Sequence, residues 1–68
     1  MSHPALLRLP EVIKRTGLSR SEVYRREALG EFPNRVNLGT RSVAWPETEV
    51  SEWIGARIRE SRNIGGAR

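Results

Sequence analysis

The sequence predicts a small α+β domain that is mostly helical, with two short helices, a β-hairpin and a closing helix. Apolar residues recur at helical spacing before and after positions 34–45, and within those positions they alternate with other residues. A chain of 68 residues allows only one domain. We expect a flexible segment at residues 1–5, the folded domain at 6–60 and a disordered tail at 61–68.

The first helix is predicted at residues 10–15. Its proline suits the first helical position, where a missing N–H leaves no hydrogen bond unmade, and Glu11 in the first turn favours the helix dipole. Leu9, Val12 and Ile13 have the i, i+3, i+4 spacing of one buried stripe. The leucines before the helix are expected to pack beneath it as an extended lead-in.

The second helix is predicted from Ser19 to about residue 29, after a tight turn at Gly17 and Leu18. Ser19 and Glu22 have the spacing of a capping box. In that motif the serine hydroxyl accepts from the N–H of Glu22, and the Glu22 carboxylate accepts from the N–H of Ser19. Val23 is the expected apolar anchor, and the glycine at position 30 is expected to end the helix in the left-handed conformation.

A β-hairpin is predicted within residues 34–45, after Phe32, which is expected to fill the core. Its alternating apolar residues are Val36, Leu38, Val43 and Trp45. The turn between the strands contains Gly39, Thr40 and Arg41, so the hairpin has a basic tip.

A last helix is predicted from Pro46 to about residue 60. Glutamates occupy its first turn and the arginines at positions 57 and 59 its last, so both ends suit the helix dipole. Its apolar face is expected to close the core over the first helix and the hairpin. That face consists of Val50, Trp53, Ile54 and Ile58.

The excess of positive charge lies in the first two-thirds of the chain. The net charge is +4, and up to Trp45 the chain has eight basic residues and four glutamates, with four of each after it. Eleven of the twelve basic residues are arginine, the side chain suited to bidentate contacts with phosphate and guanine. With a pI near 11.1, this distribution indicates a nucleic-acid binder, although a charge surplus also aids solubility.

Catalytic and metal-binding patterns are absent from the sequence, so we expect neither an enzyme nor a cofactor. The chain has one histidine, no aspartate and no cysteine, which leaves no disulfide and no Cys-based zinc site. Its apolar runs are all well short of the roughly 20 residues that span a bilayer, and the N-terminus has no signal-peptide core. We expect a soluble cytoplasmic protein with no membrane partner.

Two short helices around a tight turn are the layout of a helix-turn-helix, and the hairpin that follows would be its wing. In that layout the second helix enters a DNA major groove. The hydrogen-bonding side chains over its first two turns are Arg20, Ser21, Tyr24 and Arg25. Arg35 and Arg41 can lie along the DNA backbone or in the minor groove, and Arg15 can touch phosphate. The alternatives are a capped helix with a solvated basic face and a purely structural hairpin.

Three stretches carry a resemblance to a known family: LLRLPEVIKRTGLSRSEVYR, GEFPNRVNLGTRSVAW and ETEVSEWI, at residues 6–25, 30–45 and 47–54. Together they resemble the AlpA family of small prophage regulators, which are related to excisionases and to the winged-helix domain of MerR-type regulators. One departure is that Arg26 and Glu27 stand where the family usually has two apolar residues. Either the helix frays early, or the stem of Arg26 lies along the core edge with Glu27 paired nearby.

The resemblance implies a small winged helix-turn-helix that binds double-stranded DNA. It would regulate transcription of mobile-element genes, or direct excision with a phage-type integrase as its partner. Because the chain lacks a long C-terminal heptad helix, we expect a monomer or weak self-association in solution, with cooperative binding to repeated DNA sites. From the residue pattern and the resemblance together, the expected DNA-contacting residues are Arg15, Ser19, Arg20, Ser21, Tyr24, Arg25, Arg35, Thr40 and Arg41.

Two other functional classes remain open. One is a protein-interaction module that docks on an integrase or RNA polymerase, with only incidental DNA contact. The one-sided distribution of arginine argues against this as the sole role. The other is an RNA binder, but the sequence has no RNP-like aromatic strand and no GXXG loop.

Overall fold

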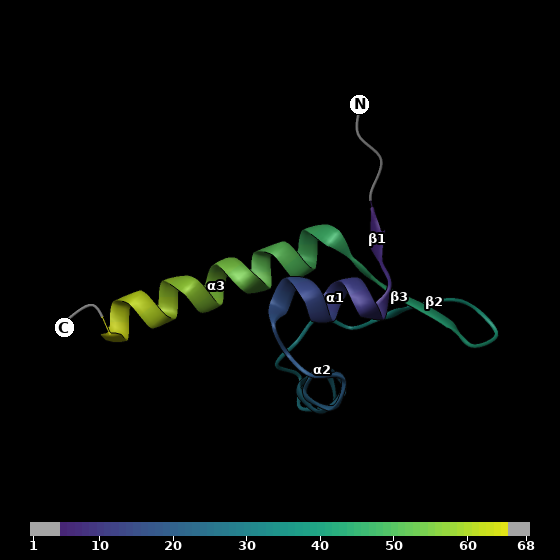
Figure 1. Cartoon of the computed structure of the whole chain (residues 1–68), viewed down its shortest axis with the longest axis horizontal. Coiled ribbons are helices and arrows are strands. Elements are labelled where there is room, and N and C mark those ends of the chain that lie inside the picture. The colour runs from purple at the N-terminus through teal and green to yellow at the C-terminus, as the bar shows by residue number, and fades with distance from the viewer. Residues whose placement is uncertain (1–4, 66–68) are drawn as a thin grey trace.

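The chain folds as two short helices, a small sheet and one long helix, which confirms the predicted α+β class with mostly helical content (Figure 1). The computed structural model describes residues 5–65. Its elements in chain order are β1 (Leu6–Leu7), α1 (Leu9–Thr16), α2 (Arg20–Ala28), β2 (Val36–Gly39), β3 (Ser42–Pro46) and α3 (Glu47–Gly65). The far end of α3 and the β2–β3 hairpin lie at opposite ends of the molecule (Figure 1). Most of the expected flexible segment, residues 1–4, and the end of the expected tail, 66–68, lie outside the described residues.

The sheet is antiparallel, with the strand order β1-β3-β2. The hairpin of β2 and β3 was predicted, but the pairing of β1 with β3 was not. Leu6 lies opposite Pro46 and Leu7 opposite Trp45, and the N–H of Glu47 donates to the Ala5 carbonyl at 2.8 Å. The lead-in to the first helix is therefore an edge strand, which places the start of α1 directly beside β3.

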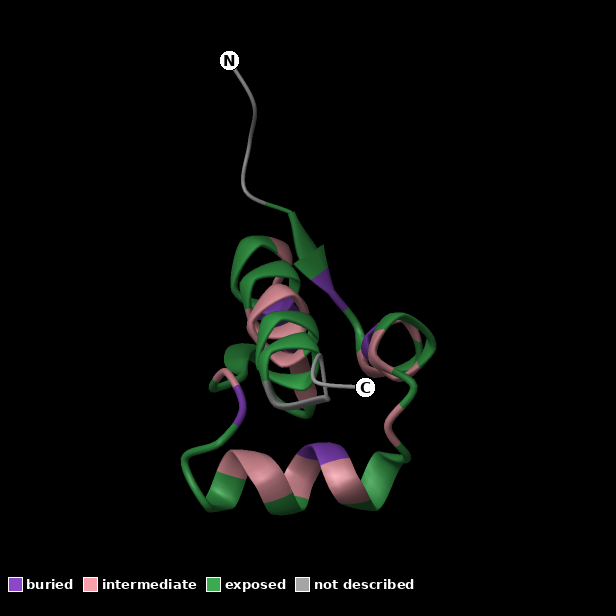
Figure 2. Cartoon of the chain, turned by 90° about the vertical axis from the view of Figure 1, so that its left-hand side faces the viewer, coloured by how far each residue is buried: buried purple, intermediate pink, exposed green. Residues whose placement is uncertain are grey.

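The core lies where the three helices meet β3. Its buried residues are Leu7, Val12, Val23, Phe32, Ala44, Trp45 and Val50. In Figure 2, α2 crosses the bottom of the molecule with its buried turn facing the other helices and its underside exposed. This arrangement leaves one long face of α2 open to solvent.

The expectation that alternating residues are half-buried is wrong for β2. Val36 and Leu38 remain 40% and 46% exposed, whereas Ala44, expected on the open side of β3, is fully buried. The difference follows from strand position: β2 is an edge strand in the protruding hairpin, whereas β3 lies in the middle of the sheet. Side-chain alternation alone does not reveal which strand is central.

The last helix differs from its prediction at both ends. Pro46 belongs to β3 and the helix begins at Glu47, while its other end is at Gly65, so the expected tail is helical over residues 61–65. Arg57 and Arg59 therefore lie in mid-helix rather than in the last turn, and Ile58 is 45% exposed rather than part of the core. The helix is supported at the point where the tail was expected to begin, because Arg57 pairs with the carboxylate of Glu60 three residues on, at 2.8 Å.

Candidate nucleic-acid interface

The turn between α1 and α2 fixes how the two helices cross. Gly17 has a φ of 75°, in the left-handed region, and its N–H donates to the Ile13 carbonyl at 2.9 Å. The Thr16 hydroxyl donates to the Val12 carbonyl at 2.8 Å and accepts from the N–H of Leu18 at 3.2 Å. With Leu18 half-buried, this turn confirms the predicted one and holds α2 in a set direction.

The N-terminus of α2 is capped by Ser19, as predicted, but only half of the capping box forms. The Ser19 hydroxyl accepts from the N–H of Glu22 at 3.2 Å. The expected return bond from Glu22 to Ser19 is wrong, because the Glu22 carboxylate instead accepts from Arg25 at 2.8 Å and from Arg26 at 3.1 Å. Glu22 therefore pairs with two arginines along the same helix.

The C-terminus of α2 forms a Schellman motif around Gly30, which has a φ of 76°. The N–H of Glu31 donates to the Arg26 carbonyl at 2.8 Å, and the N–H of Gly30 donates to the Glu27 carbonyl at 3.0 Å. Both ends of α2 are thus satisfied within the chain. The left-handed glycine confirms the predicted helix end.

Arg25 is exposed on α2 and is held by Glu22. Hydrogen bonds from Arg25 keep the pKa of the Glu22 carboxyl below its ordinary value, and the same pairing raises the pKa of Arg25. Arg26 lies half-buried with its guanidinium carbon 6.0 Å from the centre of the Trp53 ring. The expectation that its stem follows the core edge is confirmed, and α2 does not fray early.

Arg35 is tied to α2. Its guanidinium pairs with the Glu27 carboxylate, which also accepts from the backbone N–H of Arg35 at 2.6 Å. The guanidinium carbon of Arg35 also lies 5.4 Å from the centre of the Tyr24 ring. Glu27 is therefore paired as expected, and Arg35 fixes the start of the hairpin against α2.

Arg15 links α1 to the start of α3. Its guanidinium donates to the Glu47 carboxylate at 2.8 Å and to the Glu11 carboxylate at 3.0 Å. These two hydrogen bonds, with Glu47 the larger influence, raise the pKa of Arg15. Arg15 is exposed, yet both its contacts are internal.

A hollow of about 440 Å³ lies between the start of α1, the start of α2 and the hairpin tip. Arg20 and Tyr24, one helical turn apart on α2, line it together with Arg41 of the hairpin turn, which is distant in the sequence. The lining also includes Arg8, which is not among the expected DNA-contacting residues. Within residues 5–65, none of these three arginines pairs with a carboxylate. We call this surface the arginine hollow.

The remaining candidates are exposed but lie outside the lining of the arginine hollow. Ser21 is in the first turn of α2, Thr40 is in the hairpin turn, and Ser19 caps the helix. Arg15, Arg25 and Arg35 are likewise outside its lining. Glu11, one partner of Arg15, and Glu22, the partner of Arg25, stand three or four residues away in the sequence, so helical spacing could have identified these two pairs but not the pair of Arg15 with Glu47.

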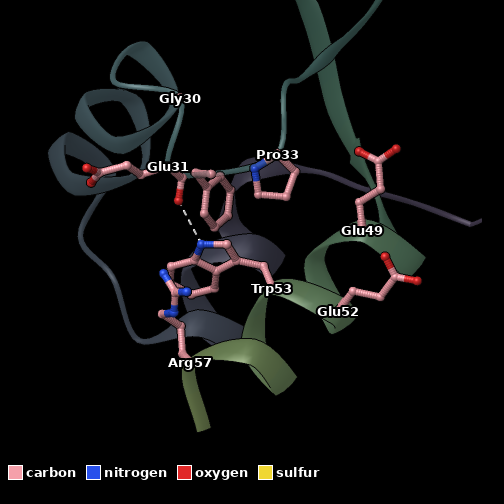
Figure 3. A pocket seen from close by; sticks show the side chains of 8 residues that line it. Gly30, Glu31, Pro33, Glu49, Glu52, Trp53 and Arg57 are labelled. Carbon is pink, nitrogen blue, oxygen red and sulfur yellow. Dashed lines mark hydrogen bonds between the residues drawn. The ribbon is translucent and has the colours of Figure 1, made fainter. Parts of the chain in front are cut away.

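A second hollow, of about 570 Å³, lies at the other end of α2, between the loop after it and α3. Figure 3 shows the Trp53 indole N–H pointing to the Glu31 carbonyl, a hydrogen bond of 2.7 Å. Phe32 meets the Trp53 ring edge-on at 4.9 Å between centroids, and the Arg57 guanidinium carbon lies 5.2 Å from the centre of that ring. The carboxylates of the lining come from Glu31, Glu49 and Glu52. We call this surface the acidic hollow.

Neither hollow is built for metal chemistry. In the described part of the chain, no three histidine, cysteine or acidic side chains are grouped so that they could hold a metal ion. Over the same residues, no helix is both long and apolar enough to cross a membrane. The polar groups of the two hollows and of the exposed candidate residues are mainly guanidinium, hydroxyl and carboxylate groups.

Comparison with known proteins identifies the family of this chain. Residues 5–58 match the family model described as prophage CP4-57 regulatory protein (AlpA). The chain is 39% identical over 62 residues to the DNA-binding transcriptional activator AlpA of Escherichia coli K12, covering 79% of this chain and 86% of that protein. It is 50% identical over 52 residues to the uncharacterized protein ORF88 of Enterobacteria phage P4, covering 76% of this chain and 59% of that protein. The chain therefore belongs to the AlpA family of prophage regulatory proteins.

Proposed function

We propose that this chain binds double-stranded DNA in a sequence-specific manner and regulates transcription of prophage or mobile-element genes. The observation that carries the proposal is the arginine hollow, which joins the N-terminal turn of α2 to the hairpin tip. A helix-turn-helix reads bases with the N-terminal residues of its second helix, while flanking elements meet the DNA backbone. The relative in E. coli K12, named as a DNA-binding transcriptional activator, supports the same activity here.

In this proposal α2 enters the major groove and the β2–β3 hairpin acts as the wing. Arg20 and Ser21 stand where base edges are read, with Tyr24 and Arg25 one turn further along. Arg41, with Thr40 beside it, would meet the backbone. Ser19 caps the N-terminus of α2.

Arg15 and Arg35 contribute less to binding in this proposal, because their guanidinium groups already pair with glutamates. Each remains exposed enough to add positive potential near the DNA. Their main role would be to set the angles at which α3 and the hairpin meet the helix pair. They would then attract DNA through their charge more than through direct hydrogen bonds to it.

The decisive experiment compares Arg20→Ala on two duplexes. The cognate site is first located by footprinting the DNA that flanks the gene. A bidentate guanine contact discriminates by about 1–3 kcal/mol, so Arg20→Ala should lose that much on the cognate duplex and far less on a scrambled one. Equal losses on the two duplexes would make Arg20 a phosphate contact and transfer base reading to Ser21 and Arg25.

A salt titration tests the electrostatic part of the proposal. If about four to six basic residues neutralise phosphates, the logarithm of the binding constant should fall with that of salt at a slope of about −4 to −5. RNA of the same sequence serves as the control. A slope near zero on duplex DNA contradicts DNA binding, and tighter binding to RNA would favour the RNA-binding alternative.

A second candidate function is docking on an integrase or RNA polymerase, as an excision factor or activator would require. The acidic hollow favours it, because its carboxylates lie away from the arginines proposed to face DNA. The variant Glu49→Gln with Glu52→Gln should then lower excision or activation while leaving duplex affinity unchanged. Unchanged excision and unchanged activation would remove this second function.

We also propose that the chain is monomeric or weakly associating in solution and cooperative on repeated sites. A single module of this size typically buries about 600–1,000 Å² on DNA, which is small for a unique site. Sedimentation of the protein alone, beside binding to duplexes with one and two sites, tests this. Equal affinity per site on both duplexes would contradict the cooperativity.

A further inference from the structure

Arg8 lies at a place in the fold where its side chain has no internal role. It is the residue between β1 and α1, and its backbone carbonyl accepts from the N–H groups of Glu11 and Val12, both at 3.0 Å. Its side chain makes no capping bond to the helix and no ion pair within residues 5–65. The backbone of Arg8 is thus fixed, while the residue is exposed and lines the arginine hollow.

The composition of this hollow is informative. Three arginines from three separate segments line it: Arg8 from the β1–α1 junction, Arg20 from α2 and Arg41 from the hairpin tip. Unpaired cations that gather on one surface repel each other, so the arrangement favours an anion between them. The apolar part of the lining comes from Leu9, Pro10 and Val43.

A lining that combines arginines with apolar side chains matches the chemistry of a nucleic-acid backbone. Guanidinium forms charge-assisted, often bidentate bonds to phosphate oxygens, and the carbon atoms of deoxyribose can cover apolar side chains. Tyr24 adds a phenol to the same lining and so can donate one further hydrogen bond. The surface therefore fits a sugar–phosphate unit better than a free inorganic anion.

We propose that Arg8 and Arg41, which line the arginine hollow on either side of the recognition helix start, clamp one phosphate of the DNA backbone, while Arg20 remains available to the base edges. This inference rests on the proposed DNA binding and adds a contact from outside both the helix-turn-helix pair and the hairpin. A phosphate held from the β1–α1 junction and from the hairpin tip, on both sides of the start of α2, fixes the angle of α2 in the groove. Arg8 therefore acts equally on every sequence.

The test measures the affinity of Arg8→Ala for a short duplex of mixed sequence, beside Arg59→Ala as the matched control. Arg59 is also an exposed arginine without a carboxylate partner in the described chain, but it lies on α3 outside both hollows. Loss of one charge-assisted contact should weaken binding about tenfold for Arg8→Ala and reduce the salt slope by about 1. Arg59→Ala should change affinity by less than about twofold.

A double-variant cycle separates a shared phosphate from general charge. If Arg8 and Arg41 hold one phosphate, the affinity loss of the double variant should differ by about twofold or more from the product of the two single-variant losses. For Arg8→Ala combined with Arg25→Ala, the affinity loss should equal the product of the two single-variant losses, because Arg25 lies outside the hollow. Multiplicative losses for Arg8 with Arg41 would overturn the shared clamp.

The outcomes also separate this inference from the proposed function. If the unaltered protein does not bind duplex DNA, the function itself fails. If it binds but Arg8→Ala behaves like Arg59→Ala, only the clamp fails. Melting temperatures of all variants, with Arg8→Gln as a second substitution of similar size, ensure that affinity is compared between folded proteins.

Discussion

The two hollows at the ends of α2 differ in whether their lining side chains are paired within the protein. In the acidic hollow, Trp53 donates to the Glu31 carbonyl, packs against Phe32 and lies beside the guanidinium groups of Arg26 and Arg57. The aromatic residues and the loop after α2 thus hold one another there. In the arginine hollow, the cations line an open surface and have no carboxylate partner in the described chain.

The difference shows that residue type is a poor guide to role in this chain. Arg15 and Arg35 are paired with glutamates of other elements and stabilise the joins between them, and Arg26 is paired with Glu22 within α2. Arg20 and Arg41 are the same residue type, yet neither pairs with a carboxylate within residues 5–65. Pairing with a glutamate of another element, rather than charge alone, separates Arg15 and Arg35 from the arginines proposed to contact DNA.

The largest expected effect is on stability, at the acidic hollow. Trp53→Ala removes a half-buried ring and its hydrogen bond to Glu31, so it should lower the free energy of unfolding by about 3 kcal/mol. Urea denaturation measures this, with Ile58→Ala on the exposed part of α3 as the control. A loss below about 1 kcal/mol would mean that the ring contributes little to the packing of α3.

The next effect is on binding, at the arginine hollow. Arg41→Ala should weaken duplex binding by about 1.4 kcal/mol, or tenfold, on cognate and scrambled sequences alike, because a backbone contact carries no sequence information. Its unfolding free energy should not fall, since the side chain is exposed and unpaired in the described chain. Unchanged affinity on both duplexes would show that the hairpin is structural.

A smaller effect concerns the cap of α2. Ser19→Ala removes the hydroxyl that accepts from the N–H of Glu22, and should lower the free energy of unfolding by about 1 kcal/mol. Ser21→Ala is the same substitution two residues on, at an exposed site, and should change stability by less than about 0.5 kcal/mol. Thermal melts of the two variants compare them directly, and equal melting temperatures would argue against the cap.

The smallest effect concerns the glutamate that pairs with Arg25. Glu22→Gln removes a negative charge from α2 and releases Arg25, so it should raise duplex affinity by about twofold to threefold. Glu60→Gln breaks a similar pair on α3 and should leave binding unchanged. If both variants bind like the unaltered protein, Arg25 does not approach the DNA.

The same pair gives a pH dependence of known sign. The Arg25 hydrogen bond lowers the pKa of Glu22 from its ordinary value of 4.5, so the folded state binds its proton less readily than the unfolded state. The stabilisation is therefore complete above pH 4.5 and is lost as the pH falls through the lower pKa of the folded protein. In Glu22→Gln this part of the acid destabilisation should disappear.

Much of the fold could be predicted because its signals are local. The Ser19 cap, the left-handed glycines at positions 17 and 30 and the apolar spacing around Val12 each depend on a few neighbouring residues. The pairing of β1 could not be predicted, since a two-residue strand has no period and is fixed only by its neighbour β3. The exposure of Val36 could not be predicted for a similar reason, because it depends on the position of β2 at the edge of the sheet.

The candidate site was predictable only in part, for a related reason. The spacing of Arg20, Ser21 and Tyr24 on a capped helix is visible in the sequence. The meeting of Arg8 with Arg41 is not, because it requires the β1–α1 junction to lie beside the hairpin tip. Likewise, the Glu27–Arg35 pair joins residues eight positions apart, which lies outside helical spacing.

Arg41 has a further consequence through its backbone. It is the only non-glycine residue within 5–65 with a positive φ, at 71°, and that conformation disfavours a side chain by about 1–2 kcal/mol. Arg41→Gly should therefore melt at a higher temperature than Arg41→Ala, while both variants lose the guanidinium. At this position selection for thermal stability favours glycine and selection for DNA affinity favours arginine, so a screen for heat-resistant variants of this protein would tend to recover weaker regulators.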